Sequence, residues 1–218
     1  MRFALWSLMA LASTVLLPAQ EKPNPAFAEA QDVEGLPHVM LIGDSISIGY
    51  TLPVRELLKG KANVHRIQTN GGPTINGLPR LEQWLGAGRW DVIHFNFGLH
   101  DLKIMEGGKR QVPLEQYESN LREIVQRLKA TGAKLIWATT TPVPEGPVNP
   151  PRERADVAAY NRAAKKVMDE AGVAVDDLYA FVLPRESELQ LPHNVHFTEA
   201  GYRALAGQVA ASIEKALK

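Results

Sequence analysis

Short apolar runs alternate along the chain with longer segments whose apolar residues recur at helical spacing. Five such runs, rich in β-forming residues, predict strands over residues 38–42, 63–68, 91–97, 133–139 and 173–175. The segments between them predict helices over residues 53–58, 75–85, 114–130 and 155–170, a partly helical stretch over 178–189, and a last helix capped by Thr198. This alternation predicts an α/β fold in which helices cover both faces of a parallel sheet.

The first predicted strand ends abruptly in a small polar motif. Gly43, Asp44 and Ser45 follow the uncharged run that ends at Ile42. Ligands of open parallel sheets bind beyond the carboxyl ends of the strands, so Ser45 is a candidate nucleophile at that edge. A Gly-Asp-Ser turn or helix cap without chemistry is the commoner interpretation of these three residues alone.

A nucleophilic serine needs a base that takes its proton. His196 closes the loop directly before the last predicted helix, where it could reach over the edge of the sheet. The other histidines considered, His38, His65 and His94, are expected to be solvated or core residues, and His94 lies mid-strand among bulky apolar neighbours. His196 is therefore the candidate base.

Composition narrows the functional classes. The 218 residues favour a single domain, and 45% hydrophobic with 22% charged residues is typical of a globular protein. Lys+Arg and Asp+Glu both number 24, so nothing in the net charge points to nucleic acid or an anionic membrane. There is no cysteine, which excludes disulfides, thiolate chemistry and a lipoprotein anchor.

The first residues have the order of regions found in a secretory signal. A positive start at Arg2 precedes an apolar run over residues 3–17, which is shorter than the roughly 20 residues of a membrane span. We predict a signal peptide and polar linker over residues 1–30 and one domain over 31–218. The protein is then exported to the periplasm or beyond, without stable membrane association after cleavage. An uncleaved anchor is the alternative, and the cleavage position is open.

Three further motifs accompany residues 43–45 in a fixed order. They are the Gly-Gly-Pro loop at 71–73, Gly-Leu-His-Asp at 98–101, and Val-His-Phe-Thr followed by Gly-Tyr at 195–202. In order and spacing, the chain resembles the SGNH (GDSL-type) esterase and lipase family over residues 38–218. The resemblance implies a three-layer α/β/α sandwich with a flavodoxin-like five-stranded parallel sheet, and an ester hydrolase activity.

The same resemblance implies roles for single residues. Ser45 corresponds to the nucleophile, His196 to the general base, and the backbone N–H groups of Ser45 and Gly72 to donors of the oxyanion hole. The family's third motif carries an asparagine where this chain has His100. A neutral imidazole has one N–H, so we expect His100 to donate in its place. The alternative is that His100 points elsewhere and only backbone donors remain.

The last motif departs from the family pattern as well. The family carries an aspartate three residues before the base, and His193 stands there in this chain. His196 is then oriented either by a backbone carbonyl, as a Ser–His dyad, or by a carboxylate that approaches in space, such as Asp101 or Glu199. Asp101 and His193 are therefore secondary candidates for the site.

Other features suggest a substrate but no cofactor. We expect no metal, because no set of three or four convergent ligands stands out, and no cofactor or nucleic-acid partner. The loops 102–112 and 141–152 are expected to form the substrate wall. Arg152 and Arg154 could meet an acidic sugar there, but we expect them to be solvated. No apolar lid of a lipase is visible, which favours a small acyl ester, for example on an O-acetylated carbohydrate. The alternatives are a catalytically weakened glycan-binding member and an acyltransferase; the oligomeric state is left open.

Overall fold

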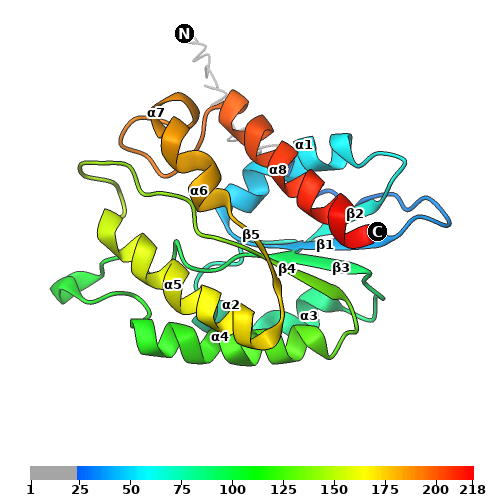
Figure 1. Ribbon diagram of the computed structural model, residues 1–218, viewed down its shortest axis with the longest axis horizontal. Coiled ribbons are helices and arrows are strands. Elements are labelled where there is room, and N and C mark those ends of the chain that lie inside the picture. Colours follow the sequence, from blue (N-terminus) through cyan, green and yellow to red (C-terminus); the bar gives the residue numbers. More distant parts are fainter. Residues whose placement is uncertain (1–23) are drawn as a thin grey trace, which may run out of the picture.

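A five-stranded parallel sheet forms the centre of the computed structural model, which describes residues 24–218. The strands are β1 (His38–Ile42), β2 (Asn63–Arg66), β3 (Val92–Phe95), β4 (Lys134–Ala138) and β5 (Ala174–Asp176), in the order β2-β1-β3-β4-β5 (Figure 1). This order confirms the predicted flavodoxin-like α/β sheet. Ile42 pairs with Phe95, and Phe95 with Trp137, so the loops after these strands leave the sheet along one edge.

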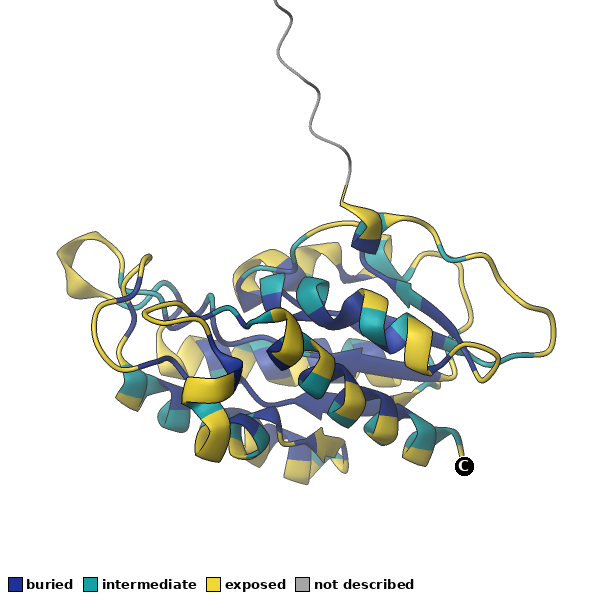
Figure 2. Cartoon of the chain, turned by 90° about the horizontal axis from the view of Figure 1, so that it is seen from above, coloured by how far each residue is buried: buried dark blue, intermediate teal, exposed yellow. Residues whose placement is uncertain are grey.

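Helices cover both faces of the sheet and complete the three predicted layers (Figure 1). One layer holds α1 (Ser45–Leu57) and α8 (Glu199–Leu217), with the short α6 (Leu178–Val182) and α7 (Glu186–Leu189) near them. The other holds α4 (Leu114–Lys129) and α5 (Arg154–Ala171), with α2 (Thr74–Gly77) and α3 (Leu81–Leu85) beside α4. Figure 2 shows the strands buried between helices whose outer sides are exposed, as their amphipathic patterns predict.

The first helix starts earlier than the sequence indicates. We expected a helix over residues 53–58, but α1 begins at Ser45, directly after β1. The carboxylate of Asp44 accepts the Ile46 N–H at 2.9 Å and caps the helix there. Pro53 then lies inside α1, although proline usually marks a first turn. The expectation was wrong because the Asp44 cap, rather than Pro53, sets the start of the helix.

The segment before β1 packs on the edge of the sheet. Ala26 is buried, and the Arg66 guanidinium lies 5.0 Å from the centre of the Phe27 ring. Residues 24–30, which belong to the predicted linker, therefore lie against the domain. The apolar core of the predicted signal peptide, residues 3–17, falls outside the described residues. Within residues 24–218, none of the helices has the length and apolar character that a membrane crossing requires.

Candidate active site

Ser45 and His196 meet at the carboxyl edge of the sheet, although 151 positions separate them. The Oγ of Ser45 lies 2.9 Å from the Nε2 of His196, within hydrogen-bond distance. Ser45 is the first residue of α1, and His196 lies in the loop that leads into α8. These two helices approach closely where the Tyr202 ring covers Gly49; any Cβ at position 49 would lie 2.1 Å from that ring. This close approach brings the two helix starts together.

Asn194 holds the opposite side of the His196 ring. Its Oδ1 lies 2.8 Å from Nδ1 of His196 and also accepts the backbone N–H of His196 at 3.0 Å. A backbone N–H can only donate, so the atom of Asn194 at this position is an oxygen. Nδ1 of His196 therefore carries the hydrogen, and Nε2 is left as the acceptor that faces Ser45. This is the tautomer that a general base for serine requires.

The sequence did not single out Asn194. An asparagine two residues before the base, in a tight loop, is a local signal for a side chain that accepts a backbone N–H. The groups considered for this place bond elsewhere: Asp101 accepts from Thr74, Glu199 pairs with Arg203, and the ring of His193 lies over Gly146. An amide oxygen thus stands where the family pattern leads one to expect a carboxylate.

The surroundings of His196 favour its neutral form. Burial lowers the pKa of His196 below the usual 6.5; the positive charge of Arg152 lowers it further, and the carboxylate of Asp44 partly opposes this. Because no carboxylate bonds to Nδ1, nothing in direct contact with the ring compensates for this loss of solvation. His196 is therefore available as a proton acceptor at neutral pH.

The two backbone N–H groups expected in the oxyanion hole, those of Ser45 and Gly72, differ in availability. The N–H of Ser45 lies in the first turn of α1 and has no acceptor within residues 24–218, because Asp44 binds the N–H of Ile46 instead. The N–H of Gly72, in contrast, donates to the Oδ1 of Asn70 at 2.9 Å. An oxyanion bound at Gly72 would have to share or replace that bond.

His100 is held in one tautomer by its neighbour Lys103. The Nζ of Lys103 lies 3.0 Å from Nδ1 of His100. A charged ammonium group can only donate, so Nδ1 accepts and the hydrogen of the neutral ring sits on Nε2. Burial lowers the pKa of His100, and the positive charges of Lys103 and Arg152 lower it further, whereas the carboxylate of Asp44 raises it and so partly opposes them. The result is a neutral imidazole with an N–H that does not bond to Lys103.

Asp101 joins the loops after β2 and β3. Its Oδ1 accepts the backbone N–H of Thr74 at 2.8 Å and the Thr74 hydroxyl at 2.5 Å. Burial raises the pKa of Asp101 to about 7, although the bonds from Thr74 oppose this rise. Gly98 makes the turn before it, with φ of 148° and no room for a Cβ, which would lie 2.1 Å from Thr140 Oγ1. The strand-end loops that carry Gly72 and His100 are thereby fixed relative to one another.

The two predicted substrate-wall loops contact each other. The N–H of Ile104 donates to the carbonyl of Pro151 at 2.9 Å. Arg152 was expected to be solvated, but it is buried: its guanidinium donates to the carbonyl oxygens of Leu99 at 2.8 Å and Pro150 at 2.9 Å. Arg154 likewise forms an ion pair with Glu186. Both arginines thus hold the loops in place.

Comparison with known proteins finds similarity to this chain both in sequence and in fold. The sequence model of the GDSL-like lipase/acylhydrolase family matches residues 41–204. An arylesterase of Vibrio mimicus is 29% identical over 109 residues, covering 45% of this chain and 52% of that protein, so the alignment spans about half of the relative's length. A GDSL esterase/lipase of Arabidopsis thaliana is 25% identical over 206 residues, covering 81% of this chain and 86% of that protein.

Solved structures agree on the fold. The crystal structure of an acetyl xylan esterase, AlAXEase, superposes with a TM-score of 0.69 at 19% identity, covering 81% of this chain and 99% of that one. At this level of identity the likeness concerns the fold. The family match, in contrast, includes the end of β1, Ser45 and the loop that carries His196, and it extends over most of the chain. The chain therefore belongs to the GDSL-like lipase/acylhydrolase family of ester-bond hydrolases.

Proposed function

We propose that this chain is a serine ester hydrolase in which Ser45 is the nucleophile, His196 the general base and Asn194 the residue that orients the base. The hydrogen bond of 2.9 Å between Ser45 Oγ and His196 Nε2 carries the proposal. It is supported by the Asn194 contact at 2.8 Å, which gives the base the correct tautomer. Nucleophile, base and orienting group then form a chain of hydrogen bonds, the arrangement by which a serine is activated.

The reaction proceeds in two halves. The Ser45 hydroxyl attacks the ester carbonyl, and Nε2 of His196 takes its proton. The tetrahedral intermediate collapses to an acyl-serine as His196 returns that proton to the leaving alcohol. Water then attacks the acyl group and gives its proton to His196. Collapse of the second intermediate releases the acid, and the proton passes back to Ser45 Oγ.

Three donors stabilise the oxyanion in this proposal. The N–H of Ser45 is free for it among residues 24–218, and Nε2–H of His100 is the second donor. Gly72 contributes once the oxyanion replaces the oxygen of Asn70 that its N–H binds in the absence of substrate. Donors of this kind act where charge develops, and the loss of one typically slows an enzyme about 10²–10³-fold.

We propose a small acyl ester as the substrate, with an O-acetylated carbohydrate as the first choice. In this proposal the loops 102–112 and 141–152 form a stiff substrate wall, because the Ile104–Pro151 bond joins them and Arg152 anchors the second loop to the carbonyl of Leu99. A stiff wall suits a short acyl group better than a long, flexible chain. The structural likeness to an acetyl xylan esterase is in keeping with this choice but concerns the fold alone.

We also propose that the protein is exported, because residues 1–30 contain charged, apolar and polar regions in the sequence typical of a secretory signal. Fractionation of cells that express the full chain, followed by N-terminal sequencing of the product, tests this. A shortened chain outside the cytoplasm is the expected result. A full-length chain that remains with the membrane would support the uncleaved anchor instead.

The deciding experiment compares the full chain with Ser45→Ala on p-nitrophenyl acetate and on acetylated xylo-oligosaccharides. Ser119→Ala, the same change on the exposed side of α4, is the matched control. We expect the control to turn over both esters at the wild-type rate and Ser45→Ala to lose turnover. Equal rates for wild type and Ser45→Ala would overturn the nucleophile assignment.

The same samples separate the alternative functions. Sugar binding without any ester turnover by the wild-type chain would overturn the hydrolase proposal in favour of a glycan-binding member. Transfer of the acetyl group to an added alcohol, in preference to water, would identify an acyltransferase. Free acetate as the main product is the result expected of a hydrolase.

A further inference from the structure

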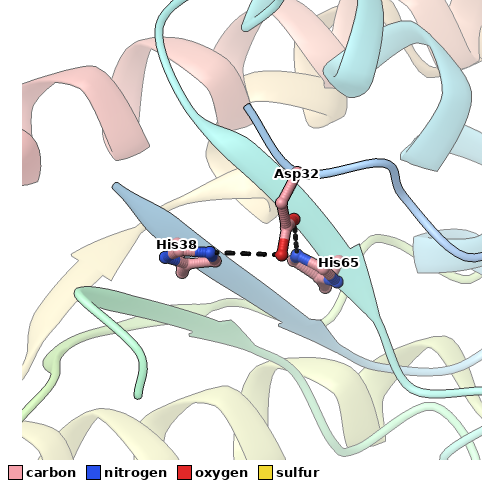
Figure 3. Close-up of side chains that lie close together, drawn as sticks. All are labelled: Asp32, His38 and His65. Atoms are coloured by element: carbon pink, nitrogen blue, oxygen red, sulfur yellow. Dashed lines mark hydrogen bonds and ion pairs between the residues drawn. The ribbon is translucent and has the colours of Figure 1, made fainter. Parts of the chain in front are cut away.

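A second cluster of histidines lies at the other end of β1, away from Ser45. His38 opens β1, and His65 lies on the neighbouring β2. Asp32, from the segment before β1, reaches over both strands and lies against both rings (Figure 3). Its Oδ1 is 2.7 Å from Nε2 of His65, and its Oδ2 is 3.3 Å from Nε2 of His38. The sequence pattern did not predict this grouping, and both histidines were expected to be solvated or core residues.

We propose that Asp32, His38 and His65 form a binding site for a divalent transition metal, of which zinc is the natural probe. The three ligand atoms all lie within 4.8 Å of one another. Tetrahedral zinc with bonds of about 2.0–2.1 Å places its ligand atoms about 3.4 Å apart, so shifts of roughly 1 Å complete the geometry. Two imidazoles and one carboxylate are a common zinc ligand set, with a fourth position left for water.

The neighbouring residues hold this set in place before any metal arrives. Asn63, which is buried, accepts the N–H of Val33 at 2.8 Å and donates to the Val33 carbonyl at 3.0 Å. Val33 directly follows Asp32, so this pair of bonds fixes the backbone from which the carboxylate extends. The side chain of Asp32 is 49% exposed and that of His38 38%, so an ion can enter from solvent.

Aromatic contacts restrict the two imidazoles. Their ring centres lie 5.9 Å apart with an angle of 28° between the planes. Trp90 meets both rings edge to face, with its ring centre 5.3 Å from that of His65 and 6.5 Å from that of His38. These contacts restrict rotation of the two rings, both of which present Nε2 to the carboxylate of Asp32. A metal at this point ties the segment 24–37 to the β1–β2 edge and stabilises the docked arrangement.

The test is calorimetric titration of zinc chloride into the full chain, His65→Ala, His38→Ala and Asp32→Asn. Asp32→Asn keeps the shape of the side chain and removes its charge. We expect one equivalent to bind to wild type and at least about tenfold weaker binding in each variant. His193→Ala removes an exposed histidine at the far edge of the sheet and should bind zinc as wild type does. Zinc should also raise the Tm of wild type by more than that of any of the three ligand variants.

Two readouts keep the result unambiguous. Turnover of p-nitrophenyl acetate by the ligand variants should equal that of wild type, which shows that they fold. Bound Cu²⁺ should quench Trp90 fluorescence, and Trp90→Phe should lose that quenching. Equal zinc binding by wild type and folded His65→Ala, or none by wild type at millimolar zinc, overturns the metal site.

Discussion

The two ends of β1 each gather histidines, but the partners of these histidines differ in charge. At the carboxyl end, His196 lies between a serine hydroxyl and an asparagine oxygen, and His100 beside an ammonium group. At the amino end, His38 and His65 share the carboxylate of Asp32. The first environment contains neutral or positive partners for the imidazoles, and the second a negative partner.

This difference assigns different chemistry to similar side chains. A base must be neutral and keep a free lone pair, which burial and the positive charge of Arg152 favour by lowering the pKa of His196. A metal site needs several ligand atoms directed at one point, and Asp32 supplies an anionic one beside His65. The partner atoms, rather than the presence of a histidine, therefore determine the use of an imidazole.

The largest expected effect is the loss of turnover in His196→Ala, which distinguishes the carboxyl end of β1 from its amino end. His196→Ala should lower kcat on p-nitrophenyl acetate by about 10⁴-fold or more, because the serine then has no base. His65→Ala, the same change at the amino end of the sheet, should keep the wild-type kcat. A comparable loss in both variants would show that the two ends are not independent.

The next largest loss of kcat is expected on substitution of Asn194. Asn194→Ala should lower kcat by roughly 10²–10⁴-fold, because His196 loses the partner that fixes its tautomer. Since Asn194 also accepts a backbone N–H, a thermal melt must accompany this measurement to separate loss of orientation from loss of fold.

Asn194→Asp tests the same contact through pH. Catalysis requires neutral His196, so kcat/KM falls as the pH drops through the pKa of this residue. In the wild type this acid limb should lie below pH 6.5, because burial lowers the pKa. A carboxylate at position 194 stabilises the imidazolium, so the limb should move to higher pH. An unmoved limb would mean that residue 194 does not bond to Nδ1.

His100 and Lys103 should have a smaller effect. His100→Ala should lower kcat about 10²-fold with little change in KM, as expected for a donor that acts on the oxyanion. Lys103→Met removes the donor to Nδ1 of His100 and should lower kcat by less than His100→Ala does, because the ring still adopts the correct tautomer part of the time. Lys109→Met, an exposed lysine of the same loop, is the control. Full activity of His100→Ala would leave only backbone donors in the hole.

The smallest effect concerns the pH dependence of stability. The pKa of Asp101 is about 7 in the fold against 3.8 for the unfolded chain, so its protonated form stabilises the fold at low pH, and this contribution is lost as pH rises toward 7. Asp101→Asn should reduce the change in the free energy of unfolding between pH 5 and pH 8, to which Asp101 contributes on the order of a few kcal/mol in the wild type. Urea unfolding at pH 5 and pH 8 measures it, with the exposed Asp169→Asn as control. An unchanged dependence in Asp101→Asn would contradict the raised pKa.

Much of the fold could be predicted from the sequence, because burial periodicity is a local property. The apolar runs identified all five strands, and the amphipathic patterns identified α4 and α5 to within about one residue at each end. The start of α1 was missed because a proline inside a helix resembles a proline at its start. Strand order was implied by the family resemblance rather than by any pattern within single segments.

The sequence by itself determined the α/β class, the Gly-Asp-Ser turn after the first strand, and the pairing of Ser45 with His196 as candidates, because motifs written in contiguous residues carry this information. Only the tertiary structure decided that Asn194 orients the His196 ring, that Lys103 fixes the tautomer of His100, and that Asp32 joins His38 and His65. Each of these depends on the direction of a side chain, and in the last case on segments brought together by strand pairing. Directions and distances of this kind arise from packing, which no single stretch of sequence encodes.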